Sequence, residues 1–257
     1  MENKSEEKRA WKKMVNPPVV TAIFQFKFDG EAIKLEDYSK YDQILRRDFP
    51  NKNDTIESCL SLPSSTRIPL GTAQVSGVTN TRRVGYIYFT NDQKEKLALT
   101  ATDITYTTER PYEGWEGCKA FVLKLLQTMS PLLESVTISR SSIRFINQFN
   151  FLEFDDPTVY FKTLITSSSE EGTLPYPLLK YGFKMTFDIE EGIYSIVNQS
   201  VEHLPEKFAY IFDIDVLNKN NYLFGITTIS DVLEKLRDIK NEIFFGNITD
   251  KTIELCS

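Results

Sequence analysis

Residues 139–151 alternate between apolar and polar side chains, and this alternation is the feature that most constrains the fold. One face would carry four large apolar residues with one amide among them: Ile143, Phe145, Asn147, Phe149 and Phe151. The other face would carry Arg140, Ser142, Arg144, Gln148 and Asn150. A period of two is produced by a β-strand and not by a helix. We therefore expect a long strand with one face in a core and one face that is hydrated or bound.

Length and composition indicate a globular chain and disfavour several classes of function. The chain has 257 residues, of which 41% are hydrophobic, so it can form a continuous core. Thirty basic against 36 acidic residues give a net charge of −6, which opposes docking on bare nucleic acid or an anionic membrane. No long apolar segment is present, so we expect a cytoplasmic protein without membrane contact.

Metal and nucleotide motifs are missing from the sequence. Three cysteines without a C-x-x-C pair and a single histidine, His203, do not give ordinary zinc spacing. Neither a Walker-type phosphate loop nor a G-x-G-x-x-G fingerprint occurs. We therefore expect no cofactor.

Periodicity divides the chain into a polar N-terminal tail, residues 1–15, and two halves, residues 16–135 and 136–257, packed as one globular unit. In the first half we expect strands at 19–28, 56–62, 72–79, 82–90 and 96–108, and helices at 37–49, capped by Asp37, and 115–134. In the second half we expect strands at 139–151, 180–189, 192–201 and 206–217, and helices at 157–166 and from Ser230 to Gly246.

Both halves thus follow the order strand, short helix, several hairpin-linked strands, long helix. This order predicts an α+β fold, in which two long helices cover an antiparallel, curved sheet, and a degenerate internal duplication. The arrangement resembles the duplicated sheets of TATA-binding-protein-like or helix-grip folds. Such a likeness does not fix function.

Several segments resemble a sporadically distributed family of bacterial and archaeal proteins of unknown function. The matching segments are residues 16–28, 112–115, 139–148, 212–215 and 243–251. The resemblance implies a prokaryotic protein, and the patchy distribution is typical of mobile or defence-linked genes. At Thr21 the chain departs from the family pattern, which leads us to expect an acidic residue there.

The polar side of residues 139–151 is the candidate binding site. Arg140 and Arg144 would lie about 13 Å apart on one strand face. Together with Asn147 and Gln148 they offer donors that need acceptors, supplied by water, by carboxylates of this chain or by a bound molecule. Arginine can bind a phosphate or a partner's carboxylate with two parallel hydrogen bonds. Internal pairing and ligand binding both stay open.

Asp213 and Asp215 would share one face of another strand, about 7 Å apart. Two carboxylates on one face can bind Mg²⁺ or Ca²⁺, usually with a third oxygen ligand. Alternatively, they pair with Arg140 or Arg144 across the sheet.

Three functions are compatible with these features. Since no catalytic set is recognisable, we expect a non-enzymatic recognition protein that binds another protein, such as the product of a neighbouring gene, in a defence or toxin–antitoxin-like system. One alternative is a metal-dependent hydrolase or nuclease that uses Asp213 and Asp215. The other is a nucleotide or nucleic-acid sensor that uses Arg140 and Arg144, which the net charge disfavours.

Overall fold

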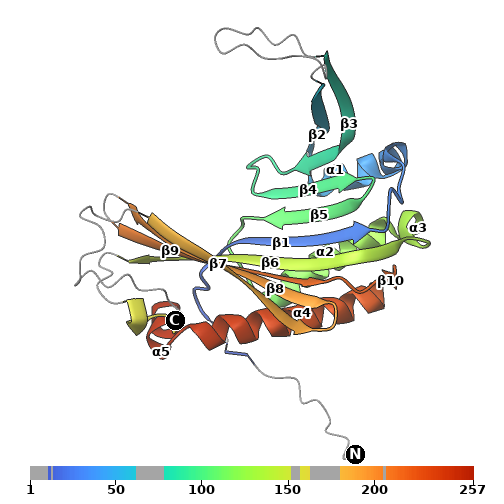
Figure 1. Ribbon diagram of the computed structural model, residues 1–257. Coiled ribbons are helices and arrows are strands. Elements are labelled where there is room, and N and C mark those ends of the chain that lie inside the picture. The colour runs from blue at the N-terminus through green and yellow to red at the C-terminus, as the bar shows by residue number, and fades with distance from the viewer. Residues whose placement is uncertain (1–10, 13, 62–77, 152–156, 163–179, 205–206) are drawn as a thin grey trace, which may run out of the picture.

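The structure, a computed structural model, describes residues 11–12, 14–61, 78–151, 157–162, 180–204 and 207–257 (Figure 1). Ten antiparallel strands form one open sheet in the order β2-β3-β4-β5-β1-β6-β9-β8-β7, with β10 beside β6. The strands are β1 (Val19–Phe28), β2 (Asn51–Ser61), β3 (Val78–Phe89), β4 (Glu95–Thr100), β5 (Asp103–Thr108), β6 (Thr137–Phe151), β7 (Lys180–Glu190), β8 (Ile193–Leu204), β9 (Lys207–Asn218) and β10 (Tyr222–Leu223). The predicted α+β class with a large antiparallel sheet is therefore confirmed.

Two long helices, α2 and α4, lie against each other and against the middle of the sheet (Figure 1). The helical elements are η1 (Leu35–Tyr41), α1 (Asp42–Asp48), α2 (Trp115–Thr128), α3 (Ser130–Leu133), η2 (Pro157–Val159), α4 (Ile226–Asn247) and α5 (Asp250–Leu255). No helix within the described ranges has the length and apolar character needed to cross a membrane.

The core forms where α2 and α4 meet the central strands β1 and β6. Their register places Ala22 opposite Phe145 and Phe24 opposite Ile143, and all four side chains are buried. Trp115, at the start of α2, closes an aromatic cluster in which its ring lies 6.0 Å from Phe24 and 6.5 Å from Phe145. The alternation of residues 139–151 is thus explained, because the apolar face of β6 is the face that the helices cover.

The strands of the two halves lie on either side of the central pair of β1 and β6. The first strand of each half is adjacent to the last strands of the same half, β1 to β5 and β6 to both β9 and β10. The two first strands then pair with each other at the centre. Four strands follow β1 before α2 and four follow β6 before α4, and the last strand of the second half, β10, has only two residues. The order of elements is therefore as expected, whereas an internal duplication stays a prediction.

Two predicted elements of the first half differ from the structure in detail. The expected helix 37–49 is a 3-10 turn followed by the short helix α1, and Asp37 lies inside the turn, where it pairs with Lys40 instead of capping. The expected helix 115–134 is interrupted at Met129 and resumes as the separate short helix α3, whose second residue is Pro131.

Strand boundaries in the first half also differ. The expected strand 96–108 is the hairpin β4–β5, which turns at Ala101 and Thr102. Residues 56–61 of the expected strand 56–62 belong to the longer strand β2, and residues 82–89 of the expected strand 82–90 belong to the longer strand β3. Most of the expected strand 72–79 lies outside the described residues.

The second half matches the predicted strands closely and the predicted helices less well. β7, β8 and β9 agree with the three expected strands. Helix α4 begins at Ile226, one turn before the expected cap Ser230, and Gly225 occupies the N-cap. It also continues past Gly246 to Asn247. Of the expected helix 157–166, only a short 3-10 turn at Pro157–Val159 is described as helical, and residues 163–166 lie outside the described ranges.

Candidate functional site

The candidate site lies on the face of the sheet opposite the helices. Side chains of β6 and β9 alternate, so residues next to the buried core positions point to this other side. We call it the open face and define it by Gln25, Lys27, Arg140, Arg144, Gln148, Lys184, Asn198, Asp213 and Asp215. Four antiparallel neighbours, β1, β6, β9 and β8, with β7 beyond them, thus collect charged and amide groups on one surface.

Arg144 and Asp213 form the centre of the open face. The guanidinium donates from Nε to Asp213 Oδ1 at 2.8 Å and from Nη2 to Oδ2 at 2.6 Å. Asn198 on β8 also donates to Asp213 Oδ2, at 2.9 Å. Since the Asp213 side chain is only 7% exposed, these bonds compensate a buried carboxylate. One of the two predicted arginines therefore pairs inside the chain.

Arg140 and Asp215 are less well satisfied. Arg140 donates from Nη2 to Gln25 Oε1 on β1, but its Nε is buried and finds no hydrogen-bond partner among the described residues. Asp215 Oδ1 is likewise buried without a partner. Burial raises the pKa of Asp215, while the positive charges of Arg144 and Arg140 act in the opposite direction. In the described part of the chain, the open face thus retains one buried donor and one buried acceptor whose hydrogen bonds are not made.

The other two predicted site residues point to opposite faces. Gln148 lies on the open face, where its Nε2 donates to Asn150 Oδ1 at 3.0 Å. Asn147 is buried in the helical layer and donates to the backbone carbonyls of Phe212 at 2.8 Å and Phe145 at 3.3 Å. The structure therefore groups Arg140, Arg144 and Gln148 and separates Asn147 from them.

Asp213 and Asp215 share one face of β9, but their surroundings do not resemble a cation site. Arg144 and Asn198 occupy both oxygens of Asp213. Within the described ranges, no group of three or more histidine, cysteine or acidic side chains could hold a metal ion. The donor set that Mg²⁺ or Ca²⁺ would need is thus not assembled around these two carboxylates.

A buried lysine in the helical layer was not anticipated from the sequence. Lys240 occupies the stripe of α4 that faces the sheet, four residues after Leu236 and four before Phe244, and is 9% exposed. Its Nζ lies 4.6 Å from the centre of the Phe145 ring. In the part of the chain that the structure describes, no carboxylate lies within ion-pair distance of it. The helical spacing of Lys240 within an apolar stripe was the available signal.

The environment of Lys240 favours its neutral form. Burial, with the positive charge of Arg237 one turn away, lowers the pKa of Lys240 to about 7. The rings of Phe145 and Phe244 supply cation–π attraction that offsets part of this cost. Lys240 therefore costs stability, because on folding its ammonium group is either buried in the core or loses its proton.

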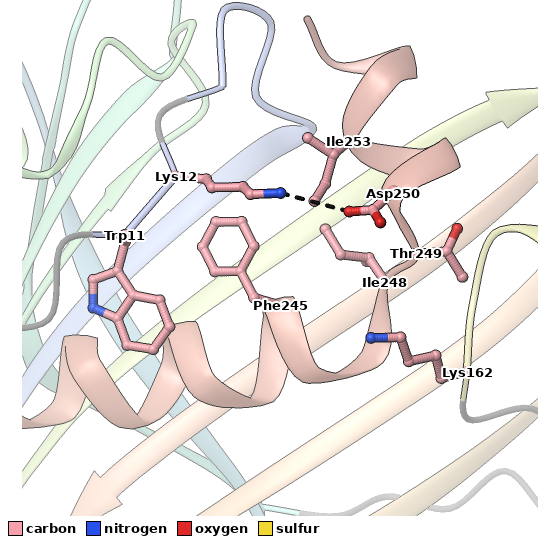
Figure 2. A pocket seen from close by; sticks show the side chains of 8 residues that line it. All are labelled: Trp11, Lys12, Lys162, Phe245, Ile248, Thr249, Asp250 and Ile253. Carbon is pink, nitrogen blue, oxygen red and sulfur yellow. Dashed lines mark hydrogen bonds and ion pairs between the residues drawn. The ribbon is translucent and has the colours of Figure 1, made fainter.

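A cavity of about 400 Å³ lies apart from the open face, beside the C-terminal part of α4 (Figure 2). It is lined by Trp11, Lys12, Lys162, Phe245, Ile248, Thr249, Asp250 and Ile253. Trp11 stacks on Phe245 with ring centres 5.7 Å apart and donates to Asp238 at 2.9 Å. Lys12 pairs with Asp250 across the cavity at 3.5 Å (Figure 2). The described end of the expected polar tail thus packs on α4.

Comparison of the chain with family models, curated proteins and solved structures finds no match. The family resemblance therefore stays a prediction, as do the prokaryotic defence setting and the cytoplasmic location.

Replacing Arg144 by methionine should lower the free energy of unfolding by about 1–3 kcal/mol, because it leaves the buried Asp213 without its counter-charge. The additional change Asp213→Leu should recover most of this loss, since it removes the unpaired carboxylate. Urea unfolding of both variants measures the effect. Equal losses in the single and the double variant would contradict the pairing.

Replacing Lys240 by methionine should stabilise the protein, on the order of 2 kcal/mol near pH 6. The folded pKa of about 7 lies below the unfolded value of 10.5, so between these values the unfolded state binds more protons. The free energy of unfolding of the wild type should therefore rise relative to that of the variant as pH rises from 7 towards 10. Urea unfolding of both proteins across this range measures the difference. A difference in unfolding free energy that does not change with pH would contradict the lowered pKa of the buried Lys240.

Proposed function

We propose that the chain is a non-enzymatic recognition protein that binds another protein through the open face of its sheet. The observation that carries this proposal is the pair of unsatisfied groups on that face, Arg140 Nε and Asp215 Oδ1. Buried polar atoms are normally hydrogen-bonded, and leaving one unpaired costs about 1–3 kcal/mol. Because both atoms are buried, a partner reaches them only after the Arg140 and Asp215 side chains turn outward, and a partner that supplies an acceptor and a donor would then recover this cost.

The chemistry of the open face favours a protein surface as the ligand. A polypeptide offers carbonyl acceptors and amide donors together, and acidic side chains would complement the cations of this face. Lys27, Arg140 and Lys184 have no described ion pair, whereas Arg144 is neutralised by Asp213. The face is a broad sheet surface, and the cavity of Figure 2 lies elsewhere. An extended polar surface with separated charges suits protein recognition better than enclosure of a small molecule.

Within this proposal the two arginines have different roles. Arg144 is a positioning residue, because its two hydrogen bonds to Asp213 fix that buried carboxylate and neutralise its charge. Arg140, held by Gln25 through a single amide oxygen, is the contact residue. The proposed partner contacts are therefore Arg140, Gln148 and Asp215. The metal-dependent hydrolase and the nucleotide sensor receive no separate support from the geometry.

Arg140→Gln should abolish partner binding with little loss of stability, because it removes the charge and the fork of donors but keeps an amide next to Gln25. Affinity purification of the full-length chain from its native cell extract, followed by mass spectrometry, measures binding. Arg47→Gln on α1 is the matched control, since Arg47 is exposed and lies on the helical side of the sheet.

We expect a protein that co-purifies stoichiometrically with the wild type and with Arg47→Gln, and that is lost with Arg140→Gln. An identical set of co-purifying proteins for all three chains would contradict the proposal. The proposal would fail equally if the wild type retained no protein at all.

A further inference from the structure

Within the described residues, the strand at one end of the sheet, β7, has a strand partner along only one of its two backbone edges. It pairs with β8 on one side, and the described strand order ends there. Its side chains are largely exposed, including Phe187 at 41% and Ile189 at 39%. An exposed apolar edge strand is a template for pairing with another strand, and proteins usually protect such edges.

The other edge strand, β2, is protected in the ways that usually prevent such pairing. Its first residues are all polar, Asn51, Lys52, Asn53, Asp54 and Thr55. A register shift after Thr55 then interrupts the ladder with β3. β7 instead keeps a regular register with β8 up to Asp188. The two ends of the sheet are thus built differently, and β7 is the one suited to receive a strand.

The sequence of β7 is complementary to itself when read in the antiparallel direction. If two copies pair about a two-fold axis at Thr186, Lys184 of each copy lies opposite Asp188 of the other. Met185 then lies opposite Phe187 on the other face of the sheet. Opposite charges and apolar pairs directly across an antiparallel ladder each stabilise it. Each favourable pair occurs twice because of the symmetry.

Other registers do not give this match. An axis at Lys184 or at Asp188 would place identical charges opposite each other. An axis at Met185 would leave Lys184 opposite Thr186. An axis at Phe187 would place Lys184 opposite Glu190, which lies beyond a register shift and already pairs with Lys235. The regular part of β7 therefore specifies the axis at Thr186.

We propose that two copies of this chain associate through antiparallel pairing of β7 with β7 about a two-fold axis at Thr186, forming one continuous sheet across the dimer. Neither Lys184 nor Asp188 has a described ion pair within its own chain, so both charges are available to the second copy. Met185, which packs on the edge of the core, would meet Phe187 of the second copy and extend the apolar layer across the axis. This inference does not depend on the proposed function.

Exchange of the two charges tests both the association and its register. Lys184→Asp and Asp188→Lys each convert two attractive pairs into two repulsive ones, which should weaken the dimer at least about tenfold. The double variant Lys184→Asp/Asp188→Lys restores the opposite charges and should restore the dimer. Lys34→Asp, at an exposed position beside η1, is the control for the change in net charge.

Sedimentation equilibrium of the full-length chain over a concentration series measures the dissociation constant, and circular dichroism checks that each variant is folded. We expect a dimer for the wild type, the control and the double variant. A monomeric wild type, or single variants that associate like the wild type, would overturn the proposal, as would a double variant as weak as the single ones. Arg140→Gln should leave the dimer intact, so failure here is distinguishable from failure of the proposed function.

Discussion

The antiparallel pairing of β1 with β6 fixes the rest of the molecule. It places Phe24 and Phe145 on one face, where Trp115 of α2 closes the aromatic cluster. A slip of one residue would turn every apolar side chain of β6 towards water and every charge towards the helices. The same register that builds the core therefore determines which groups remain on the open face. Core and candidate site are two consequences of one strand pairing.

Local periodicity was sufficient to predict strands but not their partners. The alternation in residues 139–151 identified β6 and its buried face, and hairpin signals identified β7, β8 and β9. The ion pair between Arg144 and Asp213 joins residues that lie 69 positions apart, so the sequence suggested it only as one of several pairings. Long-range partners depend on the order of strands in the sheet, which a period of two does not contain.

Burial is hardest to predict from the sequence for polar residues that lie within an apolar repeat. Asn147 followed the buried phase of β6, yet its amide made it a binding candidate; in the structure, backbone carbonyls of the sheet satisfy it. Lys240 lies in the buried stripe of α4, where a search for apolar residues alone does not detect it. For both residues, the place in the apolar repeat predicts burial better than the chemical type of the side chain does.

Strand β6 separates a face of the sheet that the helices cover from a face that they leave uncovered. Native-state thiol labelling tests this separation most directly. Single cysteines would be placed at position 147 or 148, in a chain whose three native cysteines are replaced by alanine. The account predicts that the thiol at position 148 reacts at least about a hundredfold faster than the thiol at position 147, which reacts only after local opening. Equal protection at both positions would show that a further layer covers the open face, and would contradict the account.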